Sequence, residues 1–359
     1  MLPISLKDSD KKMPLRNHNK LEDNLKLQKQ VVEALRKPEA YDGEKGQIEL
    51  KQTHISFVFL TRNFVYKMKK AVDFGFLDFS TLEKRRFFCE KELELNRRLC
   101  GDMYIEVVPV NRLDVIKIKG NGVTVEYAVK MKRMPEEKIM TRLLEEGKVD
   151  KKLIDALAKI IAEFHSKAET DKRIGEFGSL PMIETNWLEN FDQTKEFIGE
   201  TVSMENYQFI LGRITEFMKR NAAFFAKRVA ENRIREGHGD IHSGNIFVAD
   251  KIYIFDAIEF NERFRYSDVA ADIAFLAMDL DFKDRTDLSS FFVERYVEYS
   301  GDQKLEKLLQ FYKCYRAYVR GKVISFKLND PSVDKEEKSE ATKEAKAYFE
   351  LAKDYAKQF

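Results

Sequence analysis

The sequence predicts an α+β protein in two lobes, a smaller N-terminal lobe built on an antiparallel sheet and a larger, mainly helical C-terminal lobe. Its 359 residues exceed what one compact core usually holds, since a domain has roughly 150 residues. β-type alternation dominates before Pro135, whereas helical periodicity dominates after it. We therefore expect a flexible tail over residues 1–24, an N-terminal lobe over 25–134 and a C-terminal lobe over 135–359.

The first elements of the N-terminal lobe follow from local patterns. Residues 25–35 predict a short amphipathic helix that ends near Pro38. Two β-type runs, over residues 48–60 and 64–70, are separated by a turn at residues 61–63. They predict a small antiparallel sheet.

A second helix and a hairpin complete this lobe. Ser80 and Glu83 have capping-box spacing and open a predicted helix that runs to about Leu99. The segment Gly120-Asn121-Gly122 tolerates positive φ and therefore predicts a turn. The two β-type runs that flank it, residues 115–119 and 123–131, predict a β-hairpin.

The C-terminal lobe is predicted to be helical, with two short strands inside it. Helical periodicity covers residues 153–165, 205–230 and three stretches after Arg285. Residues 246–248 and 252–255 have the alternation of strands. No internal repeat is visible.

The composition excludes several classes of protein. The 63 basic and 61 acidic side chains nearly cancel, which argues against nucleic acid as a partner. Cys89, Cys100 and Cys314 are widely spaced, without a C-x-x-C pair, so neither a disulfide framework nor a zinc cluster is indicated. No run approaches the roughly 18 apolar residues of a membrane span. We expect a cytoplasmic protein without a membrane partner, and no pattern indicates its oligomeric state.

The segment from His238 to Asn245 is the one that most restricts the chemistry. It reads His238-Gly239-Asp240-Ile241-His242-Ser243-Gly244-Asn245, and an alternating apolar stretch after it ends at Asp256. An acid, an amide five residues later and an acid at a strand end are the parts that phosphoryl transfer needs. Asp240 is the candidate base for an acceptor hydroxyl, and Asn245 and Asp256 offer hard oxygen ligands for Mg²⁺.

Each of these residues, taken singly, has a structural alternative. His238 and Asp240 would satisfy turn hydrogen bonds, and Asp256 would cap a strand. The joint pattern is far rarer than its members. We therefore favour a functional role, provided that an upstream lysine anchors the nucleotide.

Such a lysine is available in the alternating stretch of residues 64–69. Val65 and Lys67 share a face, so Val65 can cover a base while Lys67 reaches phosphates. Lys69 shares that face and competes with Lys67 for the role. Most lysines in strands are solvated edge residues, which is the alternative for both.

Helical phase selects Glu92 as the partner of Lys67. Glu92 shares one stripe of the predicted helix with apolar residues, namely Phe88, Leu95 and Leu99. Glu90 instead shares its face with charged residues, as a solvated carboxylate does. An inward carboxylate needs a cationic partner, and Lys67 is the natural one.

Three segments carry a resemblance to a known family. They are Phe64-Val65-Tyr66-Lys67, Asp73-Phe74-Gly75-Phe76-Leu77-Asp78-Phe79-Ser80 and Phe255-Asp256-Ala257-Ile258-Glu259-Phe260-Asn261. On them the chain resembles the predicted-kinase branch of the aminoglycoside-phosphotransferase-type kinases, from about residue 25 to 327. The resemblance implies a protein-kinase-like bilobal fold that uses Mg²⁺ and ATP, with GTP as the alternative nucleotide.

The resemblance also implies residue roles. It implies Lys67 on the phosphates, Glu92 paired with it, Asp240 as base, and Asn245 and Asp256 on the metal. It also implies a hinge near Lys132 and Met134 that contacts adenine, and Val65 and the turn at Ser56 are further candidate nucleotide-binding positions. Arg265, Asp268 and Asp272 match the same branch and are expected to brace the catalytic loop by ion pairing, and His238 is assigned to support the same loop.

The chain departs from related kinases in two respects, and one further motif assignment is rejected. No glycine occurs between His54 and Lys67, so a Gly-rich cover over the phosphates is absent and the turn near Ser56 must serve instead. Asp73-Phe74-Gly75 precedes the catalytic loop, so we reject it as a metal-binding D-F-G segment. No G-x-x-x-x-G-K-[ST] occurs, although longer members of this branch resemble fusions with a P-loop ATPase. We expect the kinase-like module alone.

We predict transfer of the γ-phosphoryl of ATP to a hydroxyl of a small-molecule acceptor, a protein hydroxyl being the alternative. The main rival is a kinase-like nucleotide-binding regulatory module without catalysis. The segment Gly239-Asp240-Ile241-His242 also resembles the metal-binding turn of calcineurin-like phosphoesterases, but the further ligands of that site are missing. Acidic residues at Glu259, Glu262 and 279–284 would suit a cationic acceptor, although a solvated rim is favoured. The basic residues of the aromatic stretch 311–318 are expected to snorkel.

Overall fold

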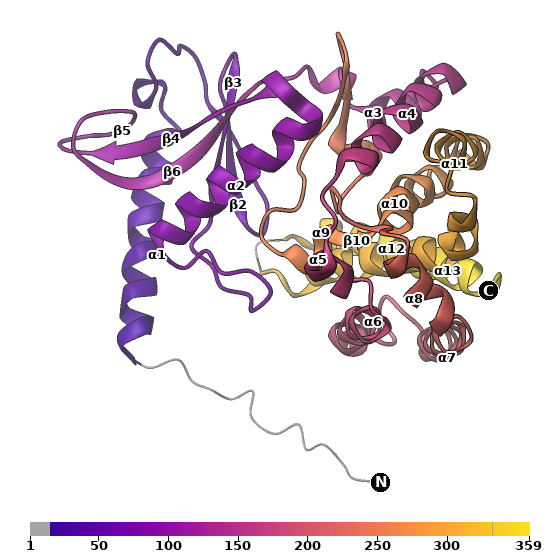
Figure 1. Cartoon of the computed structure of the whole chain (residues 1–359). Helices are drawn as coiled ribbons and strands as arrows, with labels where there is room; N and C mark the ends of the chain where they lie inside the picture. Colours follow the sequence, from indigo (N-terminus) through magenta and orange to yellow (C-terminus); the bar gives the residue numbers. More distant parts are fainter. Residues whose placement is uncertain (1–14, 332) are drawn as a thin grey trace. The chain divides into compact units, whose positions relative to one another are not determined.

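The structure is a computed structural model that describes residues 15–331 and 333–359 (Figure 1). It divides into two compact units. Unit 1 comprises Met1–Arg97 and Gly101–Arg133, and unit 2 comprises Arg98–Cys100 and Met134–Phe359. The predicted fold class is confirmed, because unit 1 is built on an antiparallel sheet and unit 2 is mainly helical.

Unit 1 is built on six antiparallel strands in the order β1-β2-β3-β6-β4-β5. They are β1 (Glu49–Gln52), β2 (Ser56–Leu60), β3 (Phe64–Lys69), β4 (Tyr104–Arg112), β5 (Ile116–Ile118) and β6 (Val123–Lys132). The predicted hairpin between β5 and β6 is wrong, because both strands pair with β4 and not with each other. Gly122 has a positive φ of 101°, and a Cβ there would lie 2.1 Å from Arg112 O. This glycine therefore permits a close approach to β4 and not a tight two-strand turn.

One helix covers each face of this sheet (Figure 1). Val31 and Leu35 of α1 (Leu15–Leu35) belong to one buried apolar cluster with Tyr66 and Met68 of β3. α2 (Leu82–Cys100) lies over the other face, where it meets the lysines of β3.

The starts of both helices differ from the prediction. Residues 15–24, predicted as part of a flexible tail, belong to α1, and residues 1–14 lie outside the described residues. The N-cap of α2 is Thr81, whose side chain accepts from Lys84 N, whereas Ser80 donates to Asp78. The cap is therefore one residue later than predicted.

Unit 2 consists of helices packed around α10 (Val269–Phe282), which is buried along almost its whole length. α10 packs against α11 (Thr286–Ser300) and α12 (Glu306–Ser325), and α12 packs against α13 (Lys335–Ala356) (Figure 1). These last three are the predicted helices after Arg285. The other helices are α3 (Met140–Glu145), α4 (Lys151–Lys167), α5 (Lys172–Glu176), α6 (Leu180–Thr194), α7 (Met204–Arg220), α8 (Ala222–Ala230) and α9 (Glu262–Arg265).

The predicted helix over residues 205–230 is two helices, α7 and α8, which meet at Asn221. Two short antiparallel pairs join β10 (Tyr266–Asp268) to β7 (Ile234–Glu236) and β8 (Ile246–Val248) to β9 (Ile252–Ile254). The loop between β7 and β8 carries the segment that predicted phosphoryl transfer.

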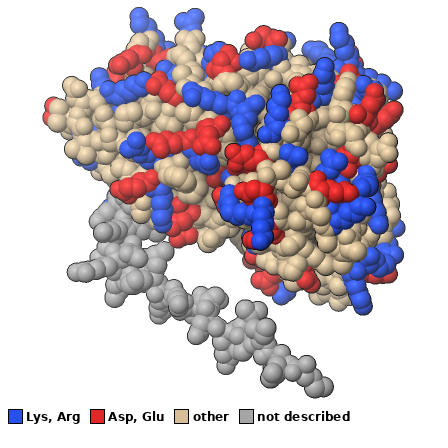
Figure 2. Space-filling model, in the orientation of Figure 1, with Lys and Arg blue, Asp and Glu red and all other residues tan. Residues whose placement is uncertain are grey.

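Charges of both signs are interspersed over the face of the described residues that Figure 2 shows, as the balanced composition leads one to expect. Within the described residues, no helix combines the length and the apolar composition that crossing a membrane requires. The three cysteines are buried.

Candidate active site

Unit 1 holds the candidate nucleotide anchor, a cluster of two lysines and one glutamate. Lys67 Nζ lies 2.9 Å from Glu92 Oε1, and Lys69 Nζ lies 2.8 Å from Glu92 Oε2. The Glu92 side chain is fully buried, Lys69 is 1 % exposed and Lys67 is 13 % exposed. The structure therefore gives both competing lysines a bond to Glu92, and Lys67 is the more accessible of the two.

The two lysines keep the Glu92 carboxyl ionised. Burial alone would raise the pKa of Glu92, but the charges of Lys67 and Lys69 lower it from 4.5 to about 2. One carboxylate then balances two ammonium groups, so the cluster keeps one net positive charge. That charge is suited to a phosphate group.

Ser56 lies on the same face as the lysine cluster. In the pairing of β2 with β3, Ser56 is directly opposite Lys69, and Val58 is opposite Lys67. Opposite residues of paired strands present their side chains to the same face of a sheet. Ser56 Oγ is buried and has no hydrogen-bond partner among the described residues.

The other predicted nucleotide-binding residues lie on three elements. Val65 is half-buried on β3 and shares the face of Lys67. Lys132 ends β6 and forms an exposed ion pair with Asp102. Met134 is half-buried at the start of unit 2.

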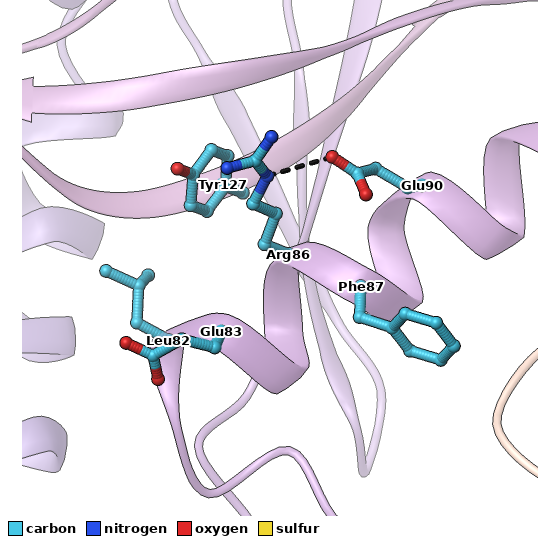
Figure 3. A pocket seen from close by; sticks show the side chains of 6 residues that line it. All are labelled: Leu82, Glu83, Arg86, Phe87, Glu90 and Tyr127. Carbon is cyan, nitrogen blue, oxygen red and sulfur yellow. Dashed lines mark hydrogen bonds and ion pairs between the residues drawn. The ribbon is translucent and has the colours of Figure 1, made fainter.

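The outer side of α2 differs from the side that carries Glu92. Glu90 is 52 % exposed and pairs with Arg86 at 2.8 Å, a difference from Glu92 that helical phase predicted. Figure 3 shows this ion pair in a pocket of about 340 Å³. Its lining residues are Leu82, Glu83, Arg86, Phe87, Glu90 and Tyr127. None of the predicted site residues lines it, and we assign it no ligand.

Unit 2 brings Asp240 and Asn245 into direct contact in the loop between β7 and β8. Asn245 Nδ2 donates to the Asp240 carboxylate Oδ2 at 2.9 Å and to the Asp240 carbonyl at 3.0 Å. This contact fixes the direction of the Asp240 side chain. Because the amide nitrogen is engaged with Asp240, the amide oxygen is the atom of Asn245 with metal-ligand chemistry.

Asp256 follows β9 and lies beside Asn245, because Phe255 N donates to the Asn245 carbonyl at 2.9 Å. Its φ of 65° falls in the left-handed region, which favours glycine. A residue other than glycine there costs free energy and is typical of sites where the direction of one side chain matters.

Carboxylates of α10 hold the backbone of residues 238–245, which we call the catalytic loop because Asp240 is the candidate base. Asp272 accepts from His238 N at 2.8 Å and from Gly239 N at 2.9 Å, one bond to each carboxylate oxygen. Asp279 accepts from Ser243 N at 2.8 Å. The loop is therefore fixed on both sides of Asp240.

The other two expected braces contact different parts of unit 2. Arg265 Nε donates to Glu236 at 3.1 Å, and its Nη1 donates to the Ile258 carbonyl at 2.8 Å, so it joins the segments that flank the loop. Asp268 accepts two bonds from Arg228 of α8, at 2.8 and 2.6 Å. Asp268 thus holds α8, and its contact with the catalytic loop is indirect.

His238 is buried under the loop. Its Nδ1 accepts from Asp240 N at 3.3 Å, and its Nε2 has no hydrogen-bond partner among the described residues. Burial lowers the pKa of His238 below its ordinary value, so the ring is neutral at neutral pH.

Asp240 is a carboxylate and a weak base. Burial alone would raise the pKa of Asp240, but the nearby His242 ring and the Arg320 guanidinium lower it below its ordinary value. A weak base suits phosphoryl transfer, in which positioning of the acceptor matters more than proton abstraction.

The metal-ligand chemistry of this loop suits Mg²⁺ that arrives with a nucleotide. Over residues 15–331 and 333–359, no group of three or more His, Cys, Asp or Glu side chains could hold a metal ion alone. Asn245 and Asp256 supply one amide oxygen and one carboxylate. Mg²⁺ in such sites takes one or two carboxylates and completes its shell with phosphate oxygens and water.

Sequence reasoning missed the part that α12 plays in this loop. Lys313 and Arg316 were expected to snorkel to the surface, which is wrong, since they are 6 % and 7 % exposed. Arg316 donates to the Gly239 carbonyl and to the Ala271 carbonyl, both at 3.0 Å. Sequence patterns show which face of a helix is inward, but they do not show which backbone atoms it meets.

Comparison with known proteins gives one matching family, the APH phosphotransferase enzyme family, over residues 90–311. Uncharacterized proteins of Mycobacterium tuberculosis and Mycobacterium bovis are 32% identical over 277 residues, which is 77% of this chain and 54% of theirs. The chain therefore spans about half the length of the curated relatives it matches.

Two solved structures share the fold at low sequence identity. A choline/ethanolamine kinase family protein from Mesorhizobium loti has a TM-score of 0.51 at 11% identity, with 92% of this chain and 99% of that chain covered. The GDP and kanamycin complex of APH(2")-IIia also has a TM-score of 0.51, at 12% identity, with 90% and 99% covered.

Proposed function

We propose that this chain, which belongs to the APH phosphotransferase enzyme family, transfers the γ-phosphoryl group of ATP, with Mg²⁺, to a hydroxyl of a small-molecule acceptor. In this proposal unit 1 binds the nucleotide, and unit 2 carries the catalytic and metal-binding loop. The observation that carries the proposal is the bond of the Asn245 amide to the Asp240 carboxylate. It holds a candidate base next to two candidate metal ligands.

The proposed reaction forms one bond and breaks one. The acceptor oxygen forms a bond to the γ-phosphorus, and the bond from that phosphorus to the β–γ bridging oxygen breaks. Asp240 accepts a hydrogen bond from the acceptor hydroxyl, aligns its oxygen and takes its proton late in the step. Asn245 keeps the Asp240 carboxylate in position.

The charged groups around this step bind and orient the nucleotide phosphates. Lys67, held by Glu92, would bind phosphate oxygens, and Ser56 Oγ would supply a hydrogen bond where other kinases use a Gly-rich loop. Mg²⁺, held by Asn245 and Asp256, would supply charge neutralisation at the phosphates when bound. Lys69 would hold Glu92 in place.

The donor half of the site is tested first, because it needs no knowledge of the acceptor. Thermal unfolding is measured with ATP, with GTP and without nucleotide, each with and without Mg²⁺, since binding to the folded state raises the midpoint. GTP is included because the complex of the structural neighbour contains GDP. We expect a Mg²⁺-dependent rise in wild type that is lost in Asp256→Ala and kept in Asp250→Ala, an exposed acid of the same hairpin.

The transfer step is tested by release of ADP in the presence of hydroxyl acceptors. We expect Asp240→Asn to lower turnover by about 10²- to 10⁴-fold, the usual contribution of a positioned base, while the nucleotide-induced rise in midpoint is kept. Full turnover in that variant would exclude the mechanism. A rise in midpoint without turnover of any acceptor would instead favour the rival, a nucleotide-binding regulatory module.

The cytoplasmic location also stays a prediction.

A further inference from the structure

One face of α12 lies against the catalytic loop and carries arginines. Arg316 donates to the Gly239 carbonyl, and Gly239 directly precedes Asp240. Arg320 follows Arg316 by four residues, so both point to the same side of the helix, about 6 Å apart along its axis. Arg320 lies one helical turn beyond Arg316, near enough to Asp240 for the two charges to interact.

The charge of Arg320 is not neutralised by an ion pair. Asp240 and Asp279 are close enough for their charges to act on the Arg320 guanidinium, but no described residue forms an ion pair with it. Its Cζ lies 5.5 Å from the centre of the Tyr348 ring. That ring stacks on Phe282 with the centroids 3.7 Å apart, so Arg320 rests on a fixed aromatic surface.

Acids that would suit a cationic acceptor already have partners within the protein. Glu262 accepts from Arg173 at 2.8 Å. Asp281 accepts from Lys313 at 2.8 Å. Asp279 accepts from a backbone N–H of the catalytic loop. A cationic group near Asp240 would therefore be repelled by Arg320, and none of these three acids is free to offset the repulsion.

We propose that the acceptor carries an anionic group, a carboxylate or a phosphate ester, and that Arg320 binds this group while the acceptor hydroxyl donates to Asp240. The planar fork of an arginine matches two oxygens of such a group, and its fixed seat on Tyr348 lowers the entropy lost on binding. The proposal rests on the proposed function, since it names the substrate class of the same site. Arg320 is thus assigned as a residue that selects the acceptor.

Matched acceptors test this assignment. Glycerate, glycerol 3-phosphate, glycerol and 3-amino-1,2-propanediol form one set, and gluconate, sorbitol and glucamine form a second, longer set. Each compound is added to the protein saturated with Mg²⁺ and ADP, and its apparent affinity is taken from the midpoint of thermal unfolding. We expect the anionic members to bind best, with the comparison of glycerate and glycerol 3-phosphate separating carboxylate from phosphate ester.

Variants separate the role of Arg320 from a general effect of charge. Arg320→Gln is expected to lower the apparent affinity for the anionic compounds roughly ten- to hundredfold, which is what loss of hydrogen bonds to a charged group costs. Neutral members should be unaffected, and Arg320→Lys should recover part of the loss. Lys327→Gln is the control, because it removes an exposed cation just after α12. Its apparent affinity for every compound should equal that of wild type.

Three outcomes would overturn the inference while Mg²⁺ and ADP still raise the midpoint. The first is a rise in midpoint with neutral or cationic members that equals or exceeds the rise with anionic ones. A complete lack of effect of the anionic members counts as this outcome. The second is an anion response that Arg320→Gln leaves intact. The third is a selective loss of ATP over ADP binding in Arg320→Gln, which would place Arg320 on the transferred phosphoryl. Failure of the proposed function is read separately, as no rise in midpoint with any nucleotide or as no release of ADP with any acceptor.

Discussion

The two groups of candidate residues are held in place by different kinds of contact. In unit 1, side chains hold one another, since Glu92 bonds Lys67 and Lys69. In unit 2, carboxylate side chains hold backbone N–H groups, as Asp272 and Asp279 do. All partners of the first group can be exchanged by substitution, whereas backbone donors stay whatever the sequence. The first group can therefore be rebuilt from other residues, but the second depends on each acid.

The largest effect is expected at Asp272. Replacing it with leucine leaves the N–H groups of His238 and Gly239 without acceptors and removes one of the two hydrogen-bond partners of His165, which lies 3.1 Å away. We expect Asp272→Leu to lower the free energy of unfolding by about 3–5 kcal/mol, measured with urea. Asp287→Leu, at an exposed acid, should cost less than about 1 kcal/mol. Equal costs would show that the loop does not depend on Asp272.

The cluster of unit 1 should be exchangeable as a whole. Glu92→Leu alone removes the buried carboxylate that both ammonium groups contact and should cost about 3–5 kcal/mol. The triple variant Lys67→Met, Lys69→Met, Glu92→Leu should regain most of that loss, because well-packed apolar residues often replace buried ion pairs at little cost. Urea unfolding measures both. A triple variant as unstable as the single one would remove the contrast between the two units.

A smaller effect should separate the two lysines. Lys67 is the more exposed, so Lys67→Met should weaken binding of Mg²⁺ and ATP about ten- to hundredfold, as loss of a charge-assisted bond does. Lys69→Met should change affinity less than about threefold and act mainly on the unfolding midpoint, since its ammonium group is buried. Equilibrium binding of a fluorescent ATP analogue measures the affinities. The reverse pattern would move the phosphate anchor by two residues.

The smallest effect is a change in acid stability. The pKa of Glu92 is lowered from 4.5 to about 2, so the unfolded chain binds a proton that the folded protein does not bind over that interval. The stability that this carboxylate contributes is present above pH 4.5 and is lost as the pH falls toward about 2. In the triple variant the free energy of unfolding should therefore fall less steeply over this interval. Glu90→Leu, at an exposed acid of the same helix, should keep the wild-type slope.

The sequence predicted most of the elements whose pattern is periodic and local. Helical phase separated the buried Glu92 from the exposed Glu90. It failed for α10, because a helix that is buried on all sides is apolar all round and has no amphipathic period. The alternation that predicts strands also failed for β4, because Pro109 interrupts it. In the structure β4 nevertheless pairs with both β6 and β5.

The candidate site divides in the same way. The spacing of Asp240, Asn245 and Asp256 singled them out, and the structure places the first two in contact. Contacts between a side chain and a distant backbone atom have no spacing rule, which is why Arg316 and Asp279 were not placed on the catalytic loop. Those contacts depend on how helices pack, and helix packing leaves little trace in a single sequence.

The left-handed backbone of Asp256 has a consequence for anyone who wishes to engineer this chain. Glycine adopts a φ of 65° without the steric cost that aspartate carries there, which is about 1 kcal/mol. A library screened for heat resistance alone would therefore tend to enrich Asp256→Gly, and each such clone would lose a carboxylate that the proposed chemistry requires. Thermal stability and the proposed catalysis therefore favour different residues at position 256. Mutagenesis that aims to stabilise this protein should keep Asp256 unchanged.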